Sequence, residues 1–121
     1  MEGPKLHALL VGINKYKAPI RSLEGCEKDV FNTAAFLKLQ SHFGKDNVHL
    51  KRLLNEEATK GSIIREFRSL FENANEKDTV LFYFSGHGCR EDADRSIWFK
   101  DDKYLEGLGC YNESTIEESV L

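Results

Sequence analysis

Residues 78–88 read Asp-Thr-Val-Leu-Phe-Tyr-Phe-Ser-Gly-His-Gly, an apolar run that ends in a turn of small residues around one histidine. Consecutive apolar and aromatic residues bounded by turn formers predict a strand buried on both faces of a parallel sheet. In open α/β sheets, ligands bind at the carboxyl ends of such strands, where His87 falls. Imidazole suits proton transfer near neutral pH, so His87 is interpreted either as a catalytic acid and base or as a residue that merely caps a strand turn.

Two other stretches predict strands of the same sheet. Residues 6–13 form a second apolar run. In residues 48–54 the apolar residues are interrupted by Lys51 and Arg52, as expected for a less buried strand nearer a sheet edge. Apolar residues at helical spacing predict a helix that starts near Cys26 and stops before Gly44, and a second helix that follows an N-cap at Thr59. The apolar positions of these helices are Val30, Phe31, Ala34, Leu37 and Phe43 in the first, and Ile63, Ile64, Phe67, Leu70, Phe71 and Ala74 in the second.

Alternating strands and helices within about 85 residues predict an α/β three-layer sandwich with a partial parallel sheet and two crossover helices. We expect the strand order 2-1-3, which would bring the loops 14–29 and 85–90 to one crevice. Residues 1–90 are thus expected to form the α/β core, and residues 91–121 a polar loop or tail. The third strand would then present an uncovered apolar edge.

Composition narrows the class of protein. The 121 residues carry a net charge of −3 with no basic stripe, which argues against a nucleic-acid partner. No run approaches the roughly 18 apolar residues of a membrane span, and the acidic, proline-containing start is unlike a secretory leader, so we expect no membrane association and a cytoplasmic protein. The three cysteines, Cys26, Cys89 and Cys110, are far apart, which predicts neither a disulfide framework nor a zinc site.

Three sequence blocks together resemble the caspase-like peptidases, and most closely the metacaspases and related fungal caspase-domain proteins. Residues 7–16 read His-Ala-Leu-Leu-Val-Gly-Ile-Asn-Lys-Tyr, residues 23–30 read Leu-Glu-Gly-Cys-Glu-Lys-Asp-Val, and residues 80–88 close on Ser-Gly-His-Gly. Their order and spacing match the family over about residues 7–90. The resemblance implies a caspase-like fold and cleavage of a peptide or protein substrate by a cysteine and histidine dyad.

The resemblance also implies roles for single residues. His87 matches the catalytic histidine, and the backbone N–H of Gly88 matches an oxyanion-hole donor. Asp29 matches the acidic residue that receives a basic side chain before the cleaved bond in metacaspase-like enzymes. A caspase-like preference for aspartate would instead use arginine, and Arg21 lies in the matching loop; we favour Asp29.

The expected nucleophile is the main departure from the family. It follows a fourth apolar strand in an Asp-x-Cys-His/Ser-Gly block, and the 121 residues contain no such block. Neither Cys89 nor Cys110 follows a buried strand. Cys26 is the thiol expected nearest to His87, either as a small apolar residue under the first helix or as a reactive auxiliary thiol.

Cofactor and partner expectations follow from the same comparison. We expect no cofactor; the family's calcium-responsive acidic residues have candidates after His87, but the spacing of these candidates does not follow the metacaspase pattern well, and we favour a solvated acidic loop over a calcium site. These candidates are Asp92, Asp94, Asp101 and Asp102. Trp98 and Phe99 are expected to cover the core or to form a docking patch. The functional alternatives are a peptidase domain completed by further sequence or a second chain, an inactive module that binds a caspase-like partner or a second copy through the third strand, and a flavodoxin-like binding domain.

Overall fold

The chain folds around a short parallel sheet with one helix on each face. The computed structural model describes residues 3–16, 20–40, 42–92 and 104–108. In chain order its elements are β1 (Leu6–Gly12), α1 (Cys26–Lys38), η1 (Lys45–Asn47), β2 (Val48–Leu54), η2 (Asn55–Glu57), α2 (Lys60–Asn73), β3 (Thr79–Ser85), β4 (Gly88–Asp92) and β5 (Tyr104–Leu108).

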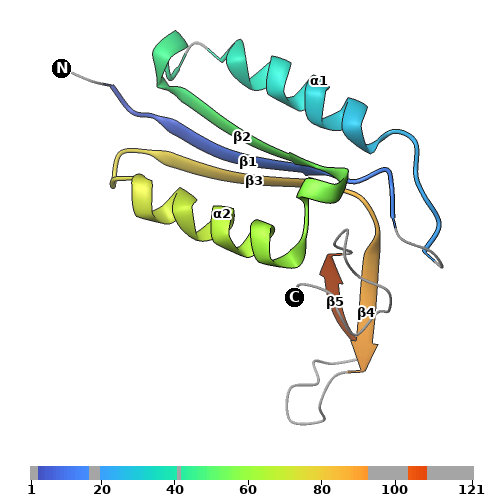
Figure 1. The fold of residues 1–121 in the computed structure, drawn as a ribbon. Helices are drawn as coiled ribbons and strands as arrows, with labels where there is room; N and C mark the ends of the chain where they lie inside the picture. Colours follow the sequence, from blue (N-terminus) through green and yellow to red (C-terminus); the bar gives the residue numbers. More distant parts are fainter. Residues whose placement is uncertain (1–2, 17–19, 41, 93–103, 109–121) are drawn as a thin grey trace.

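The sheet has the order β2-β1-β3, and both pairs are parallel, which confirms the predicted order 2-1-3 and the α/β class. Leu6 lies opposite Val48 and Thr79, and the register continues to Gly12. Helices α1 and α2 cover opposite faces of the sheet, as Figure 1 shows. The carboxyl ends of β1 and β3 therefore lie side by side, and the loops that follow them meet there.

β1 forms the centre of the core because its side chains alternate between the two helices. On one face its Leu6, Ala8 and Leu10 pack with residues of α1, and on the other its Leu9 and Val11 pack with residues of α2. The helical partners are Val30, Ala34 and Leu37 in α1, and Ile63 and Leu70 in α2. Leu9, Leu10 and Val11 are fully buried, so truncating either leucine to alanine is expected to cost about 2–5 kcal/mol of stability.

Local signals set the start of α2 as the sequence predicts. The Thr59 side chain accepts a hydrogen bond from the Ser62 N–H at 3.2 Å, which satisfies one of the free amides of the first helical turn.

Both helices are less buried on their expected apolar faces than predicted. Phe31 is 47% exposed on α1, where its ring lies 5.4 Å from the Arg52 guanidinium, and Phe71 is 57% exposed on α2.

β3 differs from the expectation of a strand buried on both faces, because its residues are only half-buried. Within the described ranges β3 pairs with β1 alone, so its outer side has no strand beside it.

The chain after His87 also differs from a plain polar tail. β4 and β5 pair antiparallel, with Gly88 opposite Leu108, as a two-stranded sheet. Among the described residues, no helix has both the length and the apolar character needed to cross a membrane.

Candidate functional site

His87 lies two residues beyond β3, at the carboxyl end of the sheet, where the loop after β1 meets it. Its ring Nε2 is 2.6 Å from the backbone oxygen of Arg21. Because a carbonyl oxygen only accepts hydrogen bonds, Nε2 must carry the proton. In the neutral ring, Nδ1 is then left with a lone pair, as a general base requires.

Tyr16 holds His87 from the other side. Its phenol oxygen accepts a hydrogen bond from the His87 backbone N–H at 2.8 Å. Its ring meets the imidazole edge to face, with centroids 4.7 Å apart and an interplanar angle of 61°. Tyr16 is buried, at 8% exposure. The histidine is therefore fixed at both its backbone and its ring by residues of the loop after β1.

An acidic side chain lies beside the end of the same strand. The Ser85 hydroxyl donates a hydrogen bond of 2.7 Å to the Asp29 carboxylate, which projects from the first turn of α1. Asp29 is exposed, so its carboxylate is accessible to a ligand cation. We call Tyr16, Arg21, Asp29, Ser85 and His87 the His87 cluster. It combines an imidazole, a carboxylate and two hydroxyl groups from three segments of the chain.

A buried asparagine shapes the loop that carries Tyr16. Asn55 has a positive φ of 49° and is 7% exposed. Its side-chain oxygen accepts from the backbone N–H groups of Asn14 and Lys15, at 2.9 and 3.0 Å. Its amide group donates to the Glu27 carboxylate. The network thus joins the end of β2, the loop after β1 and the start of α1.

Asn14 joins this loop to α1. Its side-chain oxygen accepts from the Cys26 backbone N–H at 2.7 Å, which places a side-chain acceptor at the amino end of α1. The Asn14 backbone oxygen also accepts from the Leu23 N–H at 2.6 Å, which closes the loop on itself. The segment containing Arg21 is held in place at the same time.

The structure joins His87 to the Arg21 backbone, and Asp29 to Ser85 two residues before His87, whereas the Arg21 side chain is exposed. Gly88 is exposed and begins β4. Cys26 is a free, buried thiol at the start of α1.

The side chains of Cys89 and Asp92 are not among those described, and Asp94, Trp98, Phe99, Asp101, Asp102 and Cys110 lie outside the described residues. Within the described part of the chain, no group of three or more His, Cys, Asp or Glu is placed to hold a metal ion.

Sequence reasoning missed the residues that orient the cluster. Tyr16 belongs to a block that resembles the family but has no role predicted from the pattern, and Asn55 lies outside the three blocks. The one available signal is positional: Tyr16 follows the first strand and Asn55 follows the second, so both fall at the carboxyl edge of a sheet with order 2-1-3. The role of the Arg21 backbone oxygen has no sequence signal, because every residue has a carbonyl group.

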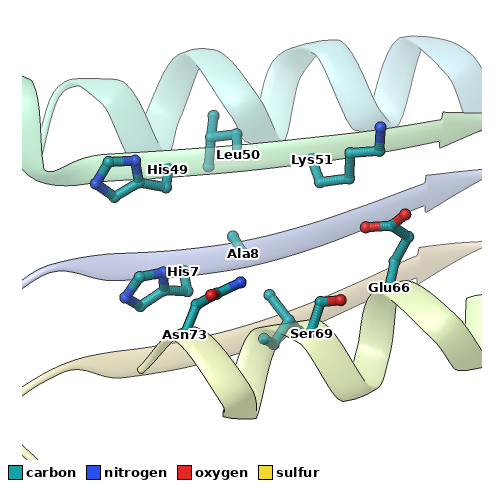
Figure 2. Close-up of a pocket in the computed structure, with 9 residues that line it drawn as sticks. His7, Ala8, His49, Leu50, Lys51, Glu66, Ser69 and Asn73 are labelled. Atoms are coloured by element: carbon teal, nitrogen blue, oxygen red, sulfur yellow. The ribbon is translucent and has the colours of Figure 1, made fainter. Parts of the chain in front are cut away.

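A separate hollow lies over the amino-terminal half of the sheet, away from His87. Figure 2 shows it between α2 and the face of the sheet formed by β1 and β2. The rings of His7 and His49, which are partners in the strand register, stack there with centroids 5.5 Å apart. His7 Nε2 is 3.0 Å from the Asp78 carboxylate. Lys51 and Glu66 also line this hollow.

The fold and the site together define a caspase-like α/β domain with its histidine at the carboxyl edge of the sheet. The family model of the metacaspase, peptidase C14 domain matches residues 6–118, so the chain belongs to the metacaspase family. It is 42% identical over 90 residues to Metacaspase-1 of Debaryomyces hansenii, covering 69% of this chain and 20% of that protein. It is 34% identical over 110 residues to Metacaspase-1 of Pyricularia oryzae, covering 84% of this chain and 26% of that protein.

Further comparisons agree on family and fold. Metacaspase-3 of Arabidopsis thaliana is 34% identical over 93 residues, which cover 72% of this chain and 25% of that protein. The chain therefore spans about a fifth to a quarter of the length of these relatives. A Geobacter sulfurreducens protein of known crystal structure has the same fold, with a TM-score of 0.71 at 20% identity, over 89% of this chain and 40% of that chain.

Proposed function

We propose that this chain supplies the histidine and the substrate-side carboxylate of a cysteine-type endopeptidase. The observation that carries the proposal is the arrangement of His87, whose Nε2 proton is held by the Arg21 carbonyl while its ring is packed on Tyr16. A neutral imidazole held in this tautomer has Nδ1 ready to take the proton of an attacking thiol. The nucleophile would come from sequence or a chain outside these 121 residues.

The substrate class follows from Asp29. Its carboxylate accepts a hydrogen bond from Ser85, which is two residues before His87 in the chain. The Ser85 hydroxyl uses one carboxylate oxygen and orients the group, and the remaining lone pairs can accept from a guanidinium or ammonium group. We therefore propose a basic residue before the cleaved bond. An acidic residue there would meet the Asp29 charge at close range and be disfavoured.

Binding of an arginine side chain tests this proposal without any need for turnover. In an NMR titration, Nα-acetylarginine amide should shift the backbone signals of Asp29 and Ser85, and Asp29→Asn should abolish the shifts. The same change at exposed Asp46, which lies in η1, is the matched control. If Nα-acetylaspartate amide binds instead and shifts Arg21, the alternative role of the Arg21 side chain is correct and the proposed specificity is wrong.

A peptidase assay tests the assignment of the nucleophile. The 121-residue chain assayed alone should not turn over peptides with Arg, Lys or Asp before the bond, with or without calcium, because no Asp-x-Cys block follows His87. Turnover that is lost in Cys26→Ala would make Cys26 the nucleophile. Turnover that survives both Cys26→Ala and His87→Ala would contradict the proposed role of the site.

The open side of β3 favours a second candidate function, an inactive module that binds a partner by strand pairing. β3 pairs only with β1 within the described residues, and its residues are half-buried. The Phe67 ring, 40% exposed, lies against Phe82 of β3 with centroids 5.5 Å apart. An unpaired strand edge beside exposed aromatic rings is suited to β-augmentation by a second copy or by a caspase-like chain.

A further inference from the structure

We propose that Tyr16 is a positioning residue for His87: its phenol group fixes the turn after β3, so that the imidazole reaches the Arg21 carbonyl and Nδ1 stays free to act as base. This inference rests on the proposed peptidase function for its biological meaning. Its structural content, that Tyr16 controls the orientation of His87, is independent of turnover.

The first step of the argument is the backbone hydrogen bond. The N–H of His87 lies between the end of β3 and the start of β4, where the ladder to β1 has ended. The Tyr16 oxygen, 2.8 Å away, supplies an acceptor at this point. A backbone donor with a fixed acceptor cannot rotate freely, so the peptide plane before His87 is locked. The direction of the Cα–Cβ bond of His87 is locked with it.

The second step is the ring contact. With the backbone fixed, the imidazole still needs a defined χ1 and χ2 to reach the Arg21 oxygen at 2.6 Å. The edge-to-face packing on Tyr16, at 4.7 Å between centroids, restricts these angles. Tyr16 thus contacts both the backbone and the ring of His87, and it does so from a buried position.

The third step concerns Gly86, which makes room for the phenol group. A Cβ atom built at Gly86 would lie 2.6 Å from the Tyr16 oxygen and 3.0 Å from Cζ of Phe84. The first distance is shorter than normal Cβ contacts and the second is tighter than most, so a side chain at residue 86 would push the Tyr16 phenol and the Phe84 ring from these positions. The Ser-Gly-His sequence and Tyr16 are therefore one steric unit, although 70 residues separate Tyr16 from Gly86.

Tyr16→Phe in the 121-residue chain tests the proposal, because it removes the acceptor and keeps the ring. We expect amide hydrogen exchange of His87 to become roughly tenfold faster relative to the core amide of Leu9. The ¹⁵N signals of the His87 imidazole should also move, since the turn that carries the ring loses its backbone hydrogen bond. Tyr83→Phe, on the opposite face of β3 from Phe82 and Phe84, is the matched control and should leave both readouts unchanged.

A double-mutant cycle with Gly86→Ala provides the second readout. Gly86→Ala should lower the unfolding midpoint less in the Tyr16→Phe background than in the wild type, because one of its two close contacts is gone. The proposal is overturned if Tyr16→Phe changes the His87 signals no more than Tyr83→Phe does, or if the exchange of His87 and Leu9 rises by the same factor, as for global loosening. Failure of arginine to bind at Asp29 would count against the proposed function and leave this result untouched.

Discussion

At the scale of single residues, His87 is held in place by groups that belong to other segments of the chain. The Arg21 carbonyl selects its tautomer, Tyr16 fixes its backbone, and Asn55 in turn shapes the loop that carries both. An imidazole alone in a flexible turn would sample many rotamers. Since a general base must meet its partner within hydrogen-bond reach, the surrounding contacts are what turn this histidine into a candidate catalyst.

Asn55 is expected to be the most sensitive polar residue of this network. Asn55→Ala leaves the N–H groups of Asn14 and Lys15 without their acceptor and puts alanine at a positive φ that asparagine tolerates better. We predict a loss of about 2–4 kcal/mol in the free energy of unfolding, measured by chemical denaturation. Asn55→Gly loses the same hydrogen bonds but relieves the strain, so it should be less destabilising than alanine. Equal stability of wild type and Asn55→Ala would contradict the network.

Asp78 joins the starts of β1 and β3, and its charge makes stability depend on pH. Its carboxylate accepts from the backbone N–H groups of Asn75 and Lys5, and these bonds, with the neighbouring His7, lower the pKa of Asp78 from 3.8 to about 2. A lowered folded-state pKa contributes stability that is present above pH 3.8 and is lost as the pH falls through about 2.

The variant Asp78→Asn cannot titrate, so it tests this contribution. We predict that it is less stable than the wild type near neutral pH and that the difference shrinks as the pH falls from about 4 to about 2. Urea unfolding at a series of pH values measures the difference, with Asp46→Asn as a control for the removed charge. A difference that stays constant over this pH range would show that the Asp78 carboxylate has no special stabilising role.

At the scale of elements, β1 and α1 approach so closely that only glycine fits between them. A Cβ at Gly12 would lie 2.6 Å from Val30 and 2.8 Å from the Cys26 carbonyl oxygen, and this oxygen belongs to backbone that cannot move aside. Gly12→Ala should therefore destabilise the chain by about 1–3 kcal/mol. A Cβ at Gly61, in the first turn of α2, would instead extend into open space.

The matched control is Gly61→Ala. It should stabilise the chain by about 0.5–1 kcal/mol, because alanine favours a helix and its methyl group meets no neighbour here. Thermal unfolding of both variants measures the contrast. If the two changes have the same sign, the close packing of β1 on α1 is not what the structure implies.

Sequence patterns predicted the elements of the core because their signals are local. The apolar runs gave β1 and β3, the bounds of β2 agree with residues 48–54, and Thr59 marked the start of α2. β4 and β5 were missed because neither has the continuous apolar run of the core strands and their pairing is non-local. The burial of Phe31 and Phe71 was also overestimated. The spacing of apolar residues along a helix indicates which face is apolar, but not how much of that face other elements bury.

The site was predictable only where a side chain has a chemical signature. His87 and Asp29 stood out by type and by resemblance to the family. The Arg21 carbonyl, the Tyr16 hydroxyl and the Asn55 amide belong to the candidate site through their positions, and these positions depend on three strands meeting at one edge. A single sequence gives no distance between residues 55 and 14, so this layer of the site needed the structure.

At the scale of the whole molecule, the outer side of β3 is the feature through which we expect the chain to self-associate. Backbone groups alternate sides along a strand. The Thr79 N–H donates to the Lys5 oxygen and the Ser85 oxygen accepts from Ile13, so odd-numbered residues of β3 face β1. Even-numbered residues, Val80 among them, then direct their N–H groups outward, where a further strand could pair.

We predict that the chain self-associates through this edge. Val80→Pro removes an outward donor and should reduce association, measured by size-exclusion chromatography with light scattering. Thr79→Pro is the matched control, because it deletes the inward bond to Lys5 and should lower stability without removing an outward donor. A wild type that is monomeric at high micromolar concentration, with slow amide exchange at Val80 and Phe82, would contradict the open-edge account.

The protonation pattern of the His87 ring is the most direct test of the central claim, that the fold presents this histidine as a base. Long-range ¹H–¹⁵N NMR of the neutral imidazole distinguishes its two tautomers. The hydrogen bond from Nε2 to the Arg21 oxygen predicts the tautomer with the proton on Nε2 and an unprotonated Nδ1. A predominant Nδ1–H tautomer, or an average of both as in a free histidine, would contradict the account.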